Sequence, residues 1–260
     1  MKTHDVRRVG VHASLLLVGL ALWMAASLMI PHGEFFLSDP VRTGRALIED
    51  VGNGSLIRHW FVSASEIVSG LTIGTIAGWI IGVTLWADKR IGEVATPYIA
   101  VAGTIPVLAL APIVVIWLGI GYVAKICIVA FSVTSVTAMH AFEGARSADR
   151  TVEELLRVHG IARRTIFTKI ILPSSFGWVF AGMRVSVGLG ILGAFVGEFI
   201  ASNAGLGYFI IRAMGLFDTT SALVGVFGII VLALSMLKGV ELLQRAVAPW
   251  SVDPAGTVRI

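Results

Sequence analysis

Long runs of apolar residues dominate the chain and are separated by shorter polar stretches. A helix needs roughly 20 apolar residues to cross about 30 Å of hydrocarbon, so these runs predict membrane-spanning helices. We place six spans near residues 10–30, 61–86, 94–118, 123–142, 177–201 and 219–241. The pattern predicts an all-α membrane protein that forms a single transmembrane domain over residues 1–260.

The first apolar run follows a short basic N-terminus that contains Lys2, Arg7 and Arg8. This order is typical of a secretory signal, whose apolar core is about 7–15 residues long. The run here extends from Gly10 to Ile30, and we interpret it as an uncleaved first span. The polar stretch 31–59 is expected to contain a short surface helix over residues 40–51.

Composition agrees with a membrane location, because 56% of the residues are hydrophobic and only 14% are charged. The pI is near 9.6, but the basic residues are dispersed without interleaved stacking aromatics, which argues against nucleic-acid binding. Lys and Arg beside the spans mark the cytoplasmic side. With the N-terminus inside, fifteen of the twenty lie inside, and the outer five are Arg42, Arg45, Arg58, Lys125 and Arg212. We expect both termini and residues 143–176 to be cytoplasmic.

Glycines and prolines mark the second and third spans. Four glycines of the second span recur at intervals of four and lie on one stripe of a helix: Gly70, Gly74, Gly78 and Gly82. Such a stripe lets another helix approach closely and predicts a packing face. In the third span Pro97, Pro106 and Pro112 each remove a backbone donor, so we expect this helix to be distorted. Pro106 and Pro112 are candidates for shaping a translocation pathway.

One acidic residue, Glu198, lies inside the apolar fifth span. An ionisable group is costly in a membrane, which makes Glu198 a functional candidate. Two roles stay open: it faces the solute pathway, or neighbouring helices satisfy it. We predict no catalytic residue and no metal site, because paired carboxylates and a Ser/His/Asp set do not occur on facing helix ends and His140 and His159 are isolated.

The charged segment 143–176 contains residues that are typical of helix starts and helix ends. Thr151 and Glu154 have the spacing of a capping box, and Gly160 suits the left-handed residue beyond a helix end. A second short helix is expected to stop near Pro173. A short helix of mixed apolar and charged character fits a groove on another protein, although such a segment can equally lie on the membrane surface.

The spacing within this segment resembles a known motif. Glu154-Leu155-Leu156, three residues, Gly160, nine residues and then Ile170-Ile171-Leu172-Pro173 are similar to the EAA loop of binding-protein-dependent ABC importer permeases. In that family the loop forms a coupling helix that sits in a cleft of the ATPase. The resemblance implies an ATPase-coupling role for Glu153, Glu154, Leu155, Leu156, Gly160, Ile161, Arg163 and Pro173. Leu155 and Leu156 replace the two alanines of the family pattern.

Further segments extend the resemblance over about residues 40–250, closest to the nitrate, sulfonate and taurine branch. They are Thr104-Ile-Pro106, Leu110-Ala-Pro112, Trp117-Leu-Gly-Ile-Gly121 with Lys125, Ala181-Gly-Met-Arg184, Gly197-Glu198-Phe199 and Gly205-Leu-Gly-Tyr208. The family often has an arginine near the position of Glu66, so we expect an altered charge at the outer mouth.

The resemblance also implies a setting and partners. The chain is expected in a bacterial cytoplasmic membrane, as a type I importer permease paired with a second copy, a cytoplasmic ABC ATPase dimer and a periplasmic substrate-binding protein. The sequence contains no G-x-x-x-x-G-K-[S/T] phosphate loop. We therefore expect no cofactor on this chain, with ATP and Mg bound by the partner ATPase.

The main alternative is an ion-gradient-driven secondary transporter. Such a protein normally has internal repeats with interrupted helices in corresponding positions of both halves. The prolines of the third span have no counterpart in the sixth. This difference favours an ATP-driven importer of a small solute, by alternating access, and leaves the solute open among sulfonates, taurine, nitrate and related compounds.

Overall fold

The computed structural model describes residues 2–147, 155–156 and 158–251, and within these ranges it contains helices and no strand. Four helices are long and apolar enough to cross a membrane: α4 (Ser55–Ala87), α7 (Tyr122–Arg146), the continuous stretch Arg164–Ile200, and α12 (Thr219–Val247). A bent pair forms a fifth candidate, and the apolar stretch Leu17–Met29 of α1 (Lys2–Met29) is shorter. The all-α membrane class is confirmed, with four to five such spans among the described residues instead of six.

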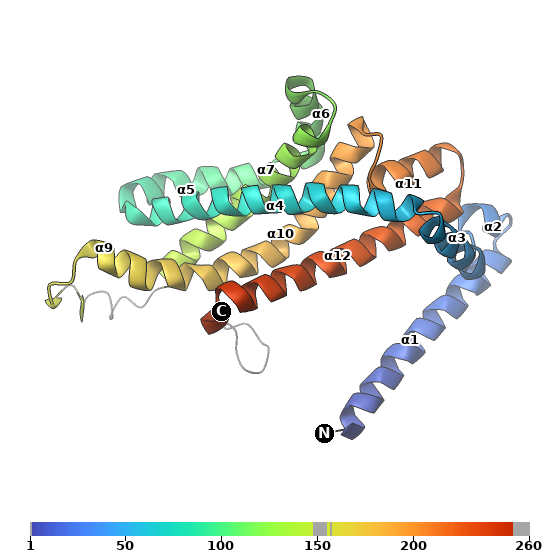
Figure 1. The fold of residues 1–260 in the computed structure, drawn as a ribbon, viewed down its shortest axis with the longest axis horizontal. Helices are drawn as coiled ribbons and strands as arrows, with labels where there is room; N and C mark the ends of the chain where they lie inside the picture. The colour runs from blue at the N-terminus through green and yellow to red at the C-terminus, as the bar shows by residue number, and fades with distance from the viewer. Residues whose placement is uncertain (1, 148–154, 157, 252–260) are drawn as a thin grey trace.

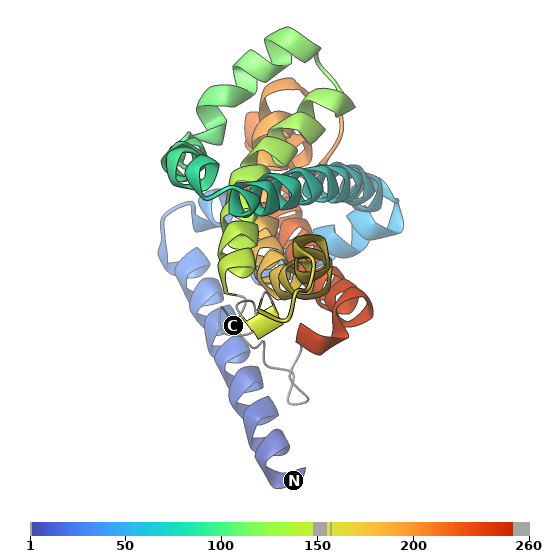
Figure 2. The ribbon, with the colours of Figure 1, turned by 90° about the vertical axis from the view of Figure 1, so that its left-hand side faces the viewer.

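Two of the long helices, α4 and α10 (Leu172–Ala201), pack along much of α7, whereas α12 packs against α10 and α4. Figures 1 and 2 show α4, α7, α10 and α12 running along one bundle, with α1 leaning away from it. Val129 and Val133 of α7 are fully buried and meet Ile67 of α4 and Val187 of α10 in the main core. The main core therefore includes the contacts of α7 with α4 and with α10.

Aspartates start two of the shorter helices. Asp39 accepts hydrogen bonds from the amides of Val41 and Arg42 at the start of α3 (Pro40–Gly52). Pro40 suits the first turn, because its missing N–H has no intrahelical partner there. The predicted surface helix over residues 40–51 is confirmed. Asp88 caps α5 (Lys89–Thr104) in the same way.

The third predicted span, residues 94–118, is wrong as one helix. It consists of α5 and α6 (Val107–Leu118), whose axes differ by 91° at a break of a few residues. The break contains Ile105 and Pro106, both in extended conformation. Pro106 has no N–H to continue the helix, and it disfavours helical φ/ψ for Ile105. Pro97 and Pro112 instead lie inside their helices.

The expectation of a helix that stops near Pro173 is also wrong. The chain continues from α9 (Arg163–Ile166) through a π-helical turn (Phe167–Ile171) into α10. Pro173 lies in the first turn of α10, where the preceding helix widens to π geometry. Wider turns of this kind absorb a missing donor without ending a helix.

The interruption predicted over residues 202–218 contains a further helix, α11 (Leu206–Gly215). It contacts α4, α10 and α12 and lies near α2 (Gly33–Phe36) and α3, at the end of the bundle opposite α9 (Figure 1). A short 3-10 turn, Pro249–Ser251, follows α12. The molecule therefore has two distinct ends, one marked by α9 and one by α3 and α11.

Candidate functional site

The segment expected to couple to an ATPase lies partly outside the described residues. The predicted capping box, Thr151 and Glu154, falls outside them, as does Glu153, and only the backbone of Arg163 is described. The described part carries exposed apolar side chains, with exposures of 57% for Leu155 and 85% for Val158. The segment is attached to the bundle end at α9 (Figure 1).

Gly160 closes the helical turn of this segment. Its φ is +74°, and the amide of Ile161 donates to the carbonyl of Leu156 at 3.0 Å. This bond spans six residues around a left-handed glycine, which is the geometry of a Schellman helix end. The structure therefore places Gly160 as the sequence predicts, while it puts Pro173 inside the next long helix and away from this turn.

The glycine stripe of α4 faces α7. A Cβ built on Gly74 would lie 2.7 Å from the carbonyl oxygen of Ala130 and 2.8 Å from Cβ of Val133. Corresponding overlaps with α7 occur at Gly70, Gly78 and Gly82. The two backbones are thus as close as only glycine permits, and these glycines line a packing face.

Glu198 is buried inside the chain, with 2% exposure. Its carboxylate accepts hydrogen bonds from Ser63 Oγ and from the amide of Gly207, both at 2.5 Å. A Cβ on Gly205 would overlap the same carboxyl group, and the φ of Gly205 is +117°. Of the two roles left open for Glu198, this geometry is that of a carboxylate satisfied by neighbouring helices.

A second buried carboxylate, Glu66, forms an ion pair with Lys125. The expectation that Glu66 alters the outer mouth is wrong, because its side chain is fully buried. Lys125, one of the five residues counted on the outer side, is also buried at 5% exposure, and it donates to Ser202 Oγ at 3.0 Å. A signal was available: an acid and a base inside two apolar spans must find partners.

The remaining pathway candidates lie on the surface of the chain. Pro106 and Pro112 are exposed, and so are neighbouring residues such as Ile116 at 79% and Trp117 at 78%. The structure therefore brings the two prolines together on the bent α5–α6 pair and places Glu198 elsewhere, in the buried interior. Large exposed apolar side chains on this pair offer a surface to lipid or to another chain.

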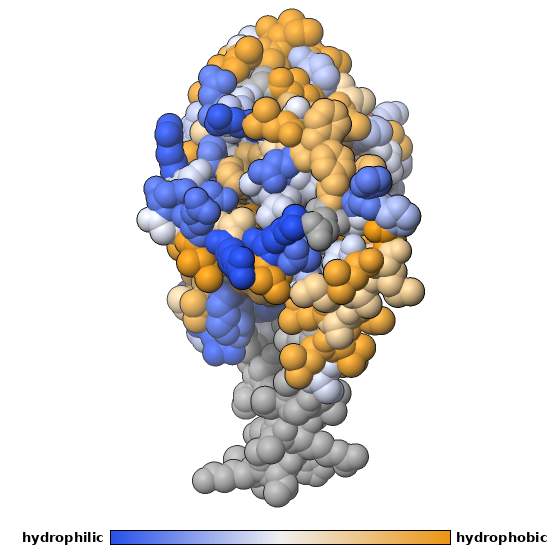
Figure 3. Space-filling view, turned by 90° about the vertical axis from the view of Figure 1, so that its right-hand side faces the viewer, coloured by the Kyte–Doolittle hydropathy of each residue, from blue (hydrophilic) through white to orange (hydrophobic). Residues whose placement is uncertain are grey.

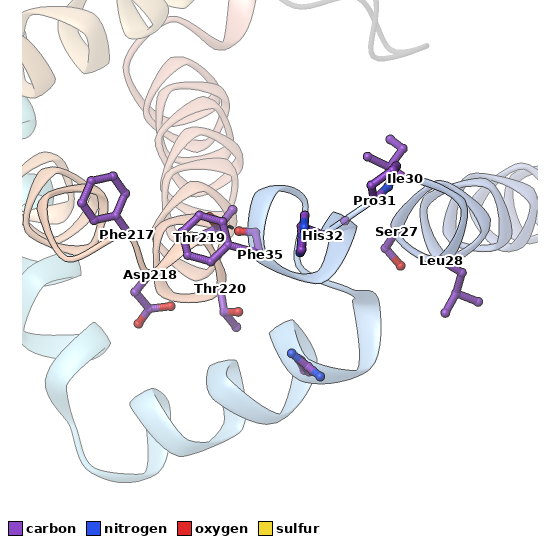
Figure 4. Close-up of a pocket in the computed structure, with 12 residues that line it drawn as sticks. Ser27, Leu28, Ile30, Pro31, His32, Phe35, Phe217, Asp218, Thr219 and Thr220 are labelled. Atoms are coloured by element: carbon purple, nitrogen blue, oxygen red, sulfur yellow. Dashed lines mark hydrogen bonds between the residues drawn. The ribbon is translucent and has the colours of Figure 1, made fainter.

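A groove of about 690 Å³ opens at the end marked by α3 and α11, between the end of α1 and the start of α12 (Figure 4). Phe35 and Phe217 stack across it with ring centroids 6.4 Å apart. Thr219 Oγ1 donates to the carbonyl of Phe35 at 2.7 Å, and the hydroxyls of Thr220 and Ser38 are 2.8 Å apart. Figure 3 faces this end and shows hydrophilic residues gathered across its middle, with hydrophobic residues above and below.

The sequence of this chain is similar to the sequences of transport proteins. Residues 70–251 match the family described as binding-protein-dependent transport system inner membrane component. The chain is 27% identical over 231 residues to the formylaminopyrimidine transport permease protein ThiX of Halalkalibacterium halodurans, covering 89% of this chain and 92% of ThiX. It is 26% identical over 249 residues to the taurine transport system permease protein TauC of Escherichia coli, covering 94% and 90%.

Solved structures share the fold at lower sequence identity. A structure of the MetNI methionine ABC transporter in inward facing conformations matches with a TM-score of 0.65 and 16% identity, covering 74% of this chain and 95% of that one. A bacterial alginate ABC transporter, solved in complex with an alginate pentasaccharide-bound periplasmic protein, matches with a TM-score of 0.58 and 14% identity, covering 94% and 97%. At these identities the likeness establishes the fold.

Proposed function

Because the chain belongs to the family of binding-protein-dependent transport system inner membrane components, we propose that it is the permease of an importer that moves a small organic solute inward when a separate ATPase hydrolyses ATP. The chain is a multi-pass inner membrane protein and an ABC importer permease. The partners, the solute and the orientation are the parts that we propose.

The coupling segment is the observation that carries the proposal. Leu155 and Val158 expose apolar side chains on a turn that Gly160 closes, beyond the bundle end at α9. An exposed apolar turn beyond the end of a membrane bundle suits insertion into a cleft on a water-soluble partner. The sequence has no phosphate loop of its own. We therefore propose that a cytoplasmic ATPase dimer binds ATP and Mg and contacts this turn.

Two copies of the chain are proposed to enclose the pathway. The α5–α6 pair exposes Pro106, Pro112 and large apolar side chains, and a second copy would give this surface a partner. ATP binding then favours one arrangement of the two copies over the other, because a ligand shifts an equilibrium only by its differential affinity. We propose that both chain termini and the coupling segment lie in the cytoplasm, because Lys and Arg beside the spans are concentrated on that side.

A periplasmic binding protein is proposed to deliver the solute at the end marked by α3 and α11. This end carries a polar surface and an open groove (Figures 3 and 4). The similar alginate transporter was solved with a periplasmic protein. The names of ThiX and TauC refer to formylaminopyrimidine and taurine, and we propose a solute of this size, a small sulfonate or a small heterocyclic compound.

The coupling segment can be tested with the double variant Glu154→Arg, Gly160→Trp. It adds opposite charge and a bulky, strained residue to the turn, so we expect loss of co-purification with the ATPase and loss of ATP-driven uptake in proteoliposomes. The matched control is Thr168→Ala, which removes an exposed hydroxyl whose bonds among the described residues go to carbonyls of the preceding helical turn.

Normal co-purification and uptake by the double variant would overturn the coupling assignment. Uphill uptake by the chain alone on an ion gradient, with no ATPase present, would instead support a secondary transporter and contradict the proposed function.

A further inference from the structure

The start of α11 is held by side chains from other helices. A helix start usually takes its capping oxygen from the residue before it, but here that residue is Gly205, which has no side chain. Three consecutive amides instead donate to distant acceptors: Gly205 to His59 Nδ1 at 3.0 Å, Leu206 to Ser63 Oγ at 2.8 Å, and Gly207 to Glu198 Oε2 at 2.5 Å. We call His59, Ser63 and Glu198 the clamp.

The clamp joins three elements at one buried point. Ser63 and Glu198 are 3% and 2% exposed, and Ser63 also donates to the Glu198 carboxylate. A negative charge is favourable at a helix start, because the backbone amides there present partial positive charge. Ser63 and Glu198 are buried and His59 is partly buried, so bonds to the two buried side chains are hard to replace and hold the start of α11 in position.

The other end of α11 is an exposed tip, residues 216–218. Leu216 and Phe217 are 70% and 74% exposed, and Phe217 has a φ of +57°. This left-handed conformation is unfavourable for a bulky side chain, so the surrounding contacts must hold it. Phe217 stacks on Phe35 at the groove described above. The ten residues of α11 span about 15 Å and link the clamp to this tip.

We propose that His59, Ser63 and Glu198 are positioning residues that set the place of the tip at the outer end, where the binding protein delivers solute. None of the three needs to touch the solute. They act through α11, which transmits the position of its clamped start to Phe217. This inference rests on the proposed function for its transport readout, while the clamp itself is measurable without transport.

His59 allows a test in which the hydrogen bond and the apolar contact are separated. The His59 ring packs on Tyr208 and Phe209 with centroids 5.9 and 5.5 Å away. His59→Leu keeps apolar volume and removes the acceptor, whereas His59→Asn loses the ring and keeps an acceptor oxygen at the position of Nδ1. A second pair is Ser63→Ala and its control Ser65→Ala; within the part of the chain that the structure describes, the Ser65 hydroxyl bonds the carbonyl of Val62 on the same helix.

Two quantities are measured on the full chain assembled with its ATPase in nanodiscs. The first is amide hydrogen exchange over residues 202–215. The second is ATPase activity at increasing concentrations of solute-loaded binding protein. For His59→Leu we expect faster exchange and an approximately tenfold higher half-saturating concentration, equivalent to about 1.4 kcal/mol, as expected for one lost hydrogen bond. Ser63→Ala loses two hydrogen bonds, the one from the amide of Leu206 and the one to Glu198, so we expect faster exchange and an increase at least as large. Basal and maximal ATPase rates are expected to hold, because the coupling segment lies at the opposite end (Figure 1).

His59→Asn and Ser65→Ala are expected to behave as the unmodified chain. Unchanged exchange in His59→Leu and Ser63→Ala would overturn the clamp. Faster exchange with an unchanged half-saturating concentration would show that the clamp stabilises α11 without affecting the binding protein, and it would overturn the positioning role. If the unmodified chain shows no stimulation by any binding protein, the proposed function fails, and the exchange data still decide whether the clamp exists.

Discussion

Charged and polar side chains buried among apolar helices are the most informative single residues of this protein. Glu66, Lys125 and Glu198 are all 5% exposed or less. Removing a charge from water costs several kcal/mol unless a partner compensates it. Lys125 compensates Glu66, and Ser63 with the amide of Gly207 compensates Glu198. Each of these groups is thus bound to a specific neighbour in the fold.

Lys125→Met tests the buried ion pair. The variant leaves Glu66 buried without its cation, and we expect a loss of about 3–5 kcal/mol in stability. The double variant Glu66→Leu, Lys125→Met removes both charges at similar volume and is expected to recover most of that loss. The stability of both variants is measured by heating each protein in detergent and determining the fraction that remains monodisperse. Equal destabilisation of the single and double variants would contradict a mutually compensating pair.

At the scale of elements, glycines decide which helices meet and a proline decides where a helix changes direction. The glycine stripe brings α4 against α7, and the Ile105–Pro106 break turns α5 into α6 by 91°. Pro173 causes no such break, because a π-helical turn precedes it and the helix continues. A proline therefore breaks one helix here and is accommodated within another.

Gly74→Ala tests the contact between α4 and α7. The added Cβ would lie 2.7 Å from a backbone oxygen of α7 that cannot move freely, so the helices must separate. We expect a loss of about 1–3 kcal/mol, the usual cost of overpacking. The control is Gly188→Ala, where a Cβ meets no described atom within 4 Å and where alanine favours the helix by up to about 1 kcal/mol. The stabilities of the two variants are compared by thermal unfolding in detergent, and equal stability would argue against tight packing at the glycine stripe.

At the scale of the whole molecule, the two ends of the bundle differ in what they expose. One end carries the turn that Gly160 closes, with Val158 exposed, and the other carries the tip with Leu216 and the groove. An importer needs this polarity, since solute enters at one side of the membrane and ATP is hydrolysed at the other. The proposed orientation assigns the tip to the outside.

Cysteine labelling tests this orientation. In a Cys127→Ser background expressed without the ATPase, Leu216→Cys is expected to react with a membrane-impermeant maleimide in intact spheroplasts. Val158→Cys, at a position that is 85% exposed, is expected to react only after permeabilisation. Labelling of Val158→Cys in intact spheroplasts, with Leu216→Cys protected, would place the turn around Gly160 outside and contradict the positive-inside assignment.

Several features could be predicted from the sequence because they depend on local composition. The long apolar runs predict the all-α membrane class, Asp39 and Pro40 mark a helix start, and Gly160 marks a helix end. Each of these follows from the chain's immediate chemistry, namely hydrophobic length, capping oxygens and a left-handed glycine. The match of residues 70–251 to a transport family agrees with the motif around Gly160.

Only the tertiary structure decided how distant residues pair. The partners of Glu66 and Glu198 lie 59 and 135 positions away in the sequence, at Lys125 and Ser63. Their pairing depends on how α4, α7 and α10 pack, and no local pattern encodes it. The sequence by itself determined that these carboxylates need partners, because burying a charge is costly wherever it occurs. The packing of α4 and α10 against α7 determined which partners they received.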